Sequence, residues 1–572
     1  MNPTATTTNR RQSGSREWLL AGALSLTASL IIIAPFFHWG SASGHDFEFH
    51  VSSWLDVAGQ WKEGILFPRW TAWANHGFGE PRFIFYPPLS WMLAPVLSFF
   101  VPWAYVPVLF IVLVQTFAGL SAFVLARRLL PYHAAIFAAV IYAANPNALL
   151  IIYMRSDFAE LLANAFFPLL LLAALRLTGL LETGKASRTR AIVGFAVTFA
   201  AVWLSNAPAG VIMTYSVVLL FGWIGFSERS WKPLAYGATG MALGFGLAGL
   251  YLVPAAYEQR WVNIGQVLSA GLLPSQNFLY TVIDDPEHNL FNWIASTNAI
   301  ILIVATGIAA LVVHRRGAGE DLISEDAKMW RVLLLLAAAA TLMMLKSTAI
   351  LWDVLPKLRF VQFPWRWMSI LAVTFAWFLA AATTKPRYRW IWMSTTIAVL
   401  AATGIFFVRN TWWDADDVPS LEFTIEHGRG FEGTDEYDPV GDDHYNLPTK
   451  GPQPQAVILP VRDGLPVPDG TRVFVERWTA EERIIRVESP EPARLALRLL
   501  NYPAWQIRVN DSFIRPESPT DTNQMMVPIP HGQSTIRVRF TRTLDRTVGL
   551  LLSLLSALLS VTLLAVTHFH FY

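Results

Sequence analysis

The feature that most constrains this chain is a succession of apolar runs, each about 20 residues long, separated by short basic segments. A spanning α-helix needs roughly 20 consecutive apolar residues. The chain of 572 residues is 54% hydrophobic and only 15% charged, whereas soluble domains carry about a quarter charged residues. We therefore predict a polytopic α-helical membrane protein with about twelve transmembrane helices. They are predicted to begin near Trp18, Tyr105, His133, Leu161, Ala191, Val211, Leu234, Trp293, Val332, Trp367, Trp390 and Val548.

The composition excludes several classes of function. The formal net charge of +2 gives no support for nucleic-acid binding. The chain has no cysteine, which excludes disulfides, thiolate metal ligands and thiol catalysis. It carries no P-loop or Rossmann glycine motif. The first apolar run lacks a convincing small-residue cleavage site, so we interpret it as a retained helix rather than a signal peptide.

The segment from Pro87 to Pro102 decides the topology, because counting it as a span would invert every later loop. It is short and bounded by prolines, so we interpret it as a half-embedded or surface helix. With the N-terminus in the cytoplasm, every short inner loop is then basic, as the positive-inside rule requires. The inner clusters are Arg10, Arg11 and Arg16; Arg127 and Arg128; Lys185, Arg188 and Arg190; Arg229 and Lys232; Arg315, Arg316, Lys328 and Arg331; and Lys385, Arg387 and Arg389.

The outer side then receives the long polar segment Arg409–Arg546. Five stretches of it alternate apolar and polar residues between Pro, Gly and Asp turns, as strands do: TRVFVERW, ERIIRVES, ARLALRLL, AWQIRVN and STIRVRF. We predict a mostly antiparallel β-sandwich there, followed by a final helix at 547–572. Residues 1–408 form the predicted membrane module, with a first outer loop at 39–103. The acidic stretches Asp414–Asp417 and Gly433–His444 are predicted to be solvated loop.

The first outer loop opens with GHDFEFHVSSW, which contains His45, Asp46 and His50. A helix over 45–61 would put Asp46 and His50 on one face, four residues apart. An acid beside an imidazole at the membrane boundary can act as a general base or hold a cation. The alternative is that Asp46 only caps the helix, since Asp is favoured at such positions. One His and one carboxylate are too few to indicate zinc.

Two other outer segments concentrate charge at membrane depth, where it is costly unless paired or functional. RSDFAE holds Arg155, Asp157 and Glu160, which form either a site or an internal ion pair. The segment from Lys346 to Arg366 sets cations among aromatic residues, so it indicates phosphate binding or, alternatively, arginine snorkelling to headgroups. A further outer segment, Pro254–Asn292, contributes Glu258 and Arg260 without a motif, together with Asp284, Asp285 and His288, most of them predicted to be solvated.

In order and sidedness, these pieces resemble the C-type (GT-C) superfamily of membrane glycosyltransferases, which use polyprenyl-phosphate-linked sugars. GHD, GILFPRW, GFGEPRFIFYPPL, RSDFAE and LRFVQFPWRW more narrowly resemble a bacterial membrane family named 6-pyruvoyl-tetrahydropterin synthase-related. NYPAWQIRVN and STIRVRF are similar to segments of YfhO-like membrane proteins. The likeness covers nearly the whole chain, although nothing in it indicates pterin chemistry.

The resemblance implies a GT-C-like inverting transferase in which Asp46 is the catalytic base, assisted by Asp157 or Glu160. Arg155 would orient the second acid or contact phosphate, and Arg359, Arg366 and Lys346 would receive the lipid phosphate. His45, His50, Glu258 and Arg260 are accessory candidates. A divalent cation (Mg or Mn) is possible in the superfamily, but neither loop has its D-x-D pattern.

The resemblance further implies a multi-pass protein of the bacterial inner membrane with an extracytoplasmic site and β-domain. The donor would be a polyprenyl-phosphate sugar, and the acceptor a glycan, lipid or protein of the cell envelope. Two other functions stay open: a transporter or flippase of lipid-linked glycans, and a non-catalytic envelope glycan assembly factor. A transporter predicts charged or broken helices near the bilayer midplane. Here the inner loops are short and basic and no acids line the cores of the helices, so the sequence favours a transporter less.

Overall fold

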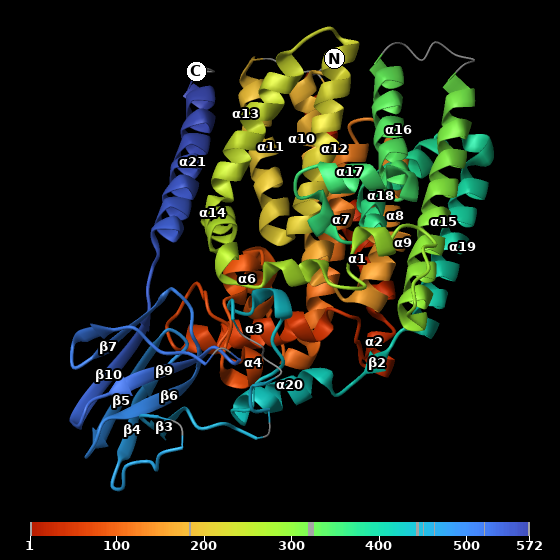
Figure 1. The fold of residues 1–572 in the computed structure, drawn as a ribbon. Coiled ribbons are helices and arrows are strands. Elements are labelled where there is room, and N and C mark those ends of the chain that lie inside the picture. The colour runs from red at the N-terminus through yellow and green to blue at the C-terminus, as the bar shows by residue number, and fades with distance from the viewer. Residues whose placement is uncertain are drawn as a thin grey trace.

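A computed structural model describes residues 3–181, 185–317, 325–441, 446–449, 451–462, 464–519 and 521–569 (Figure 1). A bundle of long helices stands on a layer of short helices, and a β-sandwich lies beside that layer. The long helices are α1 (Pro3–Ile33), α7 (Val106–Ala126), α8 (Tyr132–Ala143), α10 (Phe158–Thr178), α11 (Lys185–Ser205), α12 (Ala207–Ser227), α13 (Lys232–Leu247), α15 (Pro286–Gly317), α16 (Glu325–Met343), α18 (Met368–Ala382), α19 (Pro386–Asn410) and α21 (Leu544–Phe569).

The predicted membrane class is confirmed. Nine helices of the described chain are long and apolar enough to cross a membrane, and eleven are if each of two bent pairs counts as one span. Helix α11 stands between α10 and α13 in the same bundle. Ten of the twelve predicted starting positions lie within a helix of the bundle, and the other two, Tyr105 and Trp367, end short 3-10 turns directly before α7 and α18.

One bent pair owes its geometry to small residues. Helix α13 meets α14 (Gly249–Glu258) at 76°. A Cβ on Gly549 of α21 would lie 2.5 Å from the carbonyl oxygen of Gly249, so the two helices cross backbone against backbone. The Ser553 hydroxyl accepts from Leu250 N at 2.8 Å and donates to the Leu247 carbonyl at 2.9 Å. It thus satisfies backbone groups that the bend would leave unpaired in lipid.

The layer below the bundle is built mainly by the first outer loop. It contains α2 (Phe36–Trp39), α3 (Phe47–Lys62), α4 (Ala74–Gly77), α5 (Arg82–Phe85) and α6 (Pro88–Leu97). Helix α6 has 10 residues, about 15 Å of helix, which is half of a bilayer core. The prediction that Pro87–Pro102 does not span is therefore confirmed.

The later segment from Trp413 to Pro439 also enters this layer. Strand β2 (Trp413–Asp414) pairs with β1 (Ser41–Ala42), and α20 (Asp417–Glu426) packs on α3. The prediction of solvated loop at Gly433–His444 is wrong where it is described, because Tyr437 and Asp438 are buried, at 8% and 2% exposure. An apolar interface with Phe85 and a hydrogen bond from Asn75 to Asp438 hold them there. Residues 442–444 lie outside the described chain.

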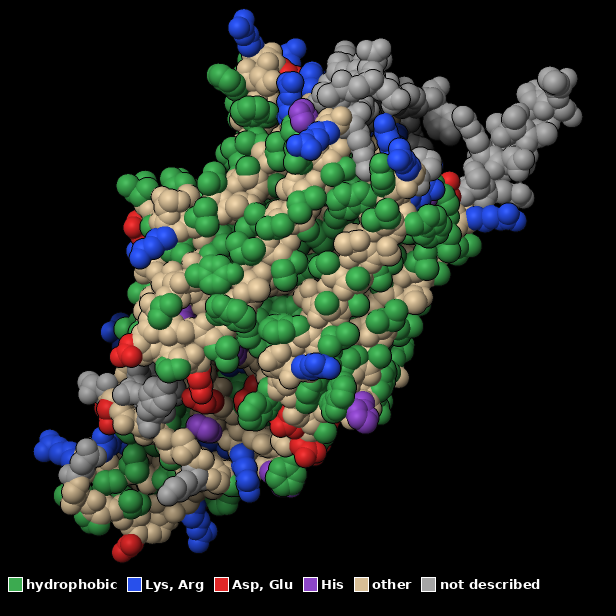
Figure 2. Space-filling view, turned by 90° about the vertical axis from the view of Figure 1, so that its right-hand side faces the viewer, with side chains coloured by type: hydrophobic (Ala, Val, Ile, Leu, Met, Phe, Trp, Pro, Cys, Tyr) green, Lys and Arg blue, Asp and Glu red, His purple; other side chains and the backbone are tan. Residues whose placement is uncertain are grey.

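The two ends of the bundle differ in charge. Both termini and the facing ends of α15 and α16 lie at one end, and the sandwich and the layer lie at the other (Figure 1). Figure 2 shows Lys and Arg side chains gathered at the first end, above a broad apolar face. The side chains of Arg10, Arg11, Lys185 and Arg316 lie outside the described residues. The predicted sidedness of basic loops and outer segments thus matches the two ends of the molecule.

The β-domain is a sandwich of two antiparallel sheets, ordered β4-β5-β10-β7-β8 and β3-β6-β9. The alternating inward residues of both sheets, such as Val487, Leu497 and Val538, are fully buried between them. All five predicted strands are present, and β3, β8 and β9 are additional. The strands are β3 (Ala456–Pro460), β4 (Arg472–Trp478), β5 (Glu482–Ser489), β6 (Ala493–Leu500), β7 (Trp505–Val509), β8 (Ser512–Ile514), β9 (Gln524–Ile529) and β10 (Gly532–Phe540).

The helix crossing can be tested with Gly549→Leu. We expect a loss of about 2 kcal/mol in the free energy of unfolding, because the added side chain must push α14 away. Gly307→Leu in α15 is the matched control, since a Cβ there meets open space within the described chain. Denaturation in mixed micelles would measure both variants, and equal stability would contradict the crossing.

Candidate functional site

The site begins at an interruption between two long helices. After α8 and α9 (Pro146–Leu150) the chain widens into one π-helical turn, Ile151–Arg155, and Ser156 then takes a left-handed conformation with φ +54°. Asp157 caps α10, accepting from Glu160 N at 2.8 Å. The interruption turns Arg155, Asp157 and Glu160 toward one point instead of distributing them around a regular helix.

The first outer loop docks against this interruption through its backbone. Asp46 N donates to the Arg155 carbonyl at 2.8 Å, and Gly44 N donates to the Ser156 hydroxyl at 3.1 Å. A Cβ on Gly44 would lie 2.5 Å from the Arg155 carbonyl carbon, so this approach requires glycine. Helix α3 starts directly afterwards, which confirms the predicted helix. The capping alternative is wrong: Asp46 makes no side-chain capping bond among the described residues and contacts Arg155 instead.

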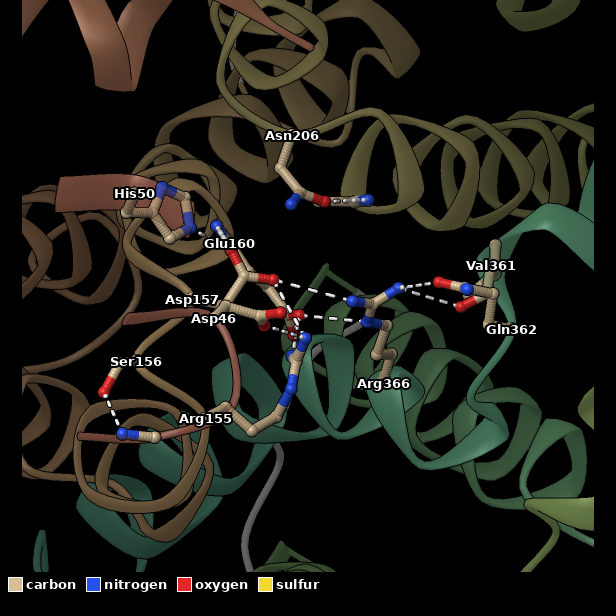
Figure 3. A network of polar contacts seen from close by, with 12 residues as sticks. Asp46, His50, Arg155, Ser156, Asp157, Glu160, Asn206, Val361, Gln362 and Arg366 are labelled. Carbon is tan, nitrogen blue, oxygen red and sulfur yellow. Dashed lines mark hydrogen bonds and ion pairs between the residues drawn. The ribbon is translucent and has the colours of Figure 1, made fainter. Parts of the chain in front are cut away.

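Arg155 is the centre of the resulting network (Figure 3). Its Nη2 lies 3.0 Å from Asp46 Oδ2 and 3.0 Å from Asp157 Oδ2, and its Nη1 contacts Glu160 Oε2. The Trp365 ring lies under the guanidinium, 5.1 Å from Cζ to the ring centroid. Both possible ion pairs within RSDFAE, Arg155–Asp157 and Arg155–Glu160, therefore form. Asp46 joins them from 109 residues away in the sequence.

A second arginine closes the network from the later outer segment. Arg366 Nε lies 3.1 Å from Glu160 Oε2, and its Nη2 lies 3.5 Å from Asp157 Oδ2. Its Nη1 donates to the Val361 carbonyl at 3.0 Å. The loop before it is strained, because Gln362 has φ +64° and ψ −57°. That strained turn folds Val361 and Gln362 back over the guanidinium (Figure 3). The snorkelling alternative for Arg366 is wrong, since it is only 6% exposed and faces the network.

His50 contacts the network from α3. Its Nε2 lies 3.5 Å from Asp157 Oδ1 and 3.5 Å from the Tyr86 hydroxyl. The imidazole is 1% exposed and packs against the Phe158 ring. In the sequence Tyr86 belongs to the YPPL segment, and no local pattern indicates that this segment packs against His50 of α3.

The members of this network differ in how deeply their side chains are buried. The side chain of Asp46 is 38% exposed, whereas those of Arg155, Asp157, Glu160 and Arg366 are between 3% and 7% exposed. Burial disfavours the charged form of Asp157, but Arg155 and the His50 hydrogen bond outweigh it and hold the pKa of Asp157 well below its usual range. Three carboxylates are paired with two guanidiniums, and Asp46 is the member of the network that solvent reaches.

Of the other predicted residues, His45 lies at the edge of the network, where it interacts electrostatically with Asp46 and Arg155, and the rest lie elsewhere. His45 is exposed and packs edge-on against Phe291. Lys346 and Arg359 are exposed on the later outer segment and contact no member of the network among the described residues. Arg260 stacks over Tyr257. In the outer segment Pro254–Asn292, Arg260, Asp284 and Asp285 are exposed, as predicted for most of its charged residues. Glu258 is the exception: it is fully buried and binds Arg546 through both carboxylate oxygens at 2.7 Å.

The possible divalent cation does not fit this arrangement. Among the described residues, no group of three or more His, Asp or Glu could hold a metal ion. The carboxylate oxygens that converge here are bound to guanidinium groups, which occupy the position a cation would need. We therefore derive no step through a metal.

Comparison with known proteins identifies the family. Residues 83–415 match the model of the 6-pyruvoyl-tetrahydropterin synthase related domain, described as a membrane protein. The match covers more than half of the chain, which therefore belongs to this family, as the sequence motifs predicted. No curated protein matches the chain.

Several solved structures are similar at low identity. An arabinofuranosyltransferase, AftD, from Mycobacteria matches at 18% identity and TM-score 0.41, over 71% of this chain and 27% of its own. An Archaeoglobus fulgidus oligosaccharyltransferase matches at 13% and 0.39, over 71% and 55%. ArnT from Cupriavidus metallidurans matches at 12% and 0.29, over 78% and 94%. This chain thus spans about a quarter of the length of AftD and about half of the length of the oligosaccharyltransferase.

Glu160→Gln should lower the free energy of unfolding by about 3 kcal/mol, because it leaves two buried guanidiniums short of a carboxylate. Asp46→Asn should change it by less than about 1 kcal/mol, since Asp46 is partly solvated. Denaturation of both variants in the same micelles measures the difference. Equal losses would show that Asp46 is as structural as Glu160.

Proposed function

We propose that this protein is a membrane glycosyltransferase that transfers a sugar from a polyprenyl-phosphate donor to a cell-envelope acceptor. The observation that supports it most is Asp46, a partly exposed carboxylate held at the edge of a buried charge network. A surface carboxylate needs no such support, whereas a catalytic base must keep one orientation. The motif resemblance to GT-C enzymes gives the reaction class.

Asp46 is proposed as the general base. Oδ2 is bound to Arg155, and no other side-chain partner of Asp46 is present in the described chain, which leaves Oδ1 for an acceptor hydroxyl. As the hydroxyl proton passes to Asp46, the acceptor oxygen attacks the anomeric carbon of the sugar. The bond from that carbon to the phosphate oxygen breaks, the anomeric centre inverts, and polyprenyl phosphate leaves.

Arg155 and Arg366 are proposed as positioning residues rather than direct phosphate ligands. Their guanidinium groups already bind Asp46, Asp157 and Glu160. Arg155 keeps Asp46 oriented, and Arg366 holds Glu160 and Asp157 in place behind it. Lys346 and Arg359 remain proposed phosphate ligands, since both are exposed on the outer segment that ends in Arg366 and could stabilise the leaving group electrostatically.

One observation favours the transporter alternative: two of the candidate spans are bent, by 76° and 89°, and transporters use broken helices. The positions of the charges weigh against it. Arg155 is the last residue of one candidate span, and Glu160 and Arg366 are each the third residue of theirs. The network therefore lies at span ends rather than at mid-depth, which suits a surface reaction better than a passage.

Asp46→Asn should reduce sugar transfer at least 100-fold while leaving the thermal midpoint within a few degrees of wild type. The loss follows from removing a base, which contributes roughly two to four orders of magnitude. Transfer from purified polyprenyl-phosphate sugars is the assay, and Glu48→Gln, two residues later in the first turn of α3, is the matched control. Full activity of Asp46→Asn, or no transfer by wild type, would contradict the proposal.

We further propose that the network and sandwich face the outside of a bacterial inner membrane, with the N-terminus inside. Because the chain lacks cysteine, single cysteines can report sidedness. Asp469→Cys in the sandwich should react with an impermeant maleimide in intact cells, whereas Arg128→Cys should react only after lysis. The reverse pattern would overturn the orientation without affecting the site.

A further inference from the structure

A cavity of about 440 Å³ lies where the first outer loop, α14, α21 and the sandwich meet. This is within the roughly 300–1,000 Å³ typical of ligand pockets. Its charged lining residues are Arg69, Arg542, Arg546 and Glu481. No hydrogen bond or ion pair of the described residues joins this lining to the Asp46 network, so the cavity is a separate feature of the molecule.

The arginines of this cavity are not equally neutralised. Arg546 is bound by Glu258 through both carboxylate oxygens at 2.7 Å. Arg69 and Arg542 make no hydrogen bond or ion pair within the described chain. The lining itself holds three arginines and one acid, Glu481. Glu258 and the buried Asp545 lie outside the lining, and neither forms a hydrogen bond or ion pair with Arg69 or Arg542 in the described chain.

Among the three arginines of the cavity, Arg69 is the one whose charge is both partly buried and, among the described residues, unpaired. Its guanidinium is half-buried over the Phe67 ring, 4.3 Å from the centroid, and it has no carboxylate at contact distance in the described chain. Burial and the repulsion of Arg546 lower the pKa of Arg69 to about 10, although Glu258 partly offsets this. An anion bound in the cavity would offset both the cost of burying the Arg69 charge and its repulsion by Arg546.

The cavity opens along a lipid-facing helix. Leu250 and Leu550 complete its wall on the bundle side. Beyond them, α21 exposes Leu551, Leu554 and Leu558, at 53%, 56% and 64%. Arg542 lies two residues before α21, and the first turn of α21, whose N-terminus has a partial positive charge, contains Asp545 and Arg546. A ligand here would therefore contact cationic groups at one end and a hydrocarbon-facing surface at the other.

We propose that this cavity binds the phosphate of an anionic membrane lipid, with Arg69 and Arg542 as ligands and the lipid chain along α21. Planar guanidiniums match phosphate oxygens in pairs. The continuous apolar wall favours a lipid phosphate over a free one. This site is distinct from the proposed transfer reaction, and its test does not depend on that activity.

The test is native mass spectrometry of the purified full chain titrated with dioleoyl phosphatidic acid, and with dioleoyl phosphatidylcholine for comparison. Wild type should bind phosphatidic acid at least tenfold more tightly than phosphatidylcholine. Arg69→Gln combined with Arg542→Gln should remove most of that preference. Arg472→Gln combined with Arg537→Gln is the matched control, because it removes two exposed charges from the sandwich outside the cavity.

A second variant guards against misfolding. Arg542 is exposed, so Arg542→Gln alone should fold normally and weaken phosphatidic acid binding at least threefold. Inorganic phosphate should compete only at concentrations far above those of the lipid. Equal binding of both lipids, an unaffected double variant, or displacement by phosphate at the lipid's own concentration would each overturn the proposal.

Discussion

The arrangement of the candidate site depends on the buried guanidinium of Arg155. A charge at 3% exposure is unfavourable unless it is paired, and Arg155 is paired with three carboxylates from two segments. Removing any buried partner leaves an uncompensated charge, so the network restricts how the first outer loop can dock on the bundle. The backbone bonds from Gly44 and Asp46 to the Ser156 hydroxyl and Arg155 carbonyl reinforce the same docking.

A second buried ion pair, Glu258–Arg546, holds the junction between the bundle and the sandwich together. Glu258 of α14 binds Arg546 of α21 and accepts from the Tyr502 hydroxyl of the sandwich at 2.6 Å. Trp70 of the first outer loop packs against Trp505 beside it. The first outer loop is thus held at one side by the Arg155 network and at the other by this aromatic and ionic junction, which places Arg69 between bundle and sandwich.

Some of these contacts could be predicted from the local sequence, and others could not. RSDFAE indicated its own ion pairs because the partners are five residues apart or fewer. The role of Asp46 was harder to predict, since capping suits Asp at a helix start, and the deciding partner is 109 residues away. The burial of Glu258 could not be predicted from the sequence, because its partners, Tyr502 and Arg546, lie more than 240 residues later. Lys346 and Arg359 share a segment with Arg366, but the strained turn at Gln362 brings Arg366 alone into the network.

The sequence by itself determined the membrane class, the positions of the spanning helices and the five main strands. Those follow from the length and period of apolar patterns, which are local properties of a chain in lipid or water. The tertiary structure alone decided which charges meet. A π-helical turn, a glycine without a Cβ and a strained loop bring Asp46, Arg155 and Arg366 together, and each of these acts through contacts between distant segments that no local pattern records.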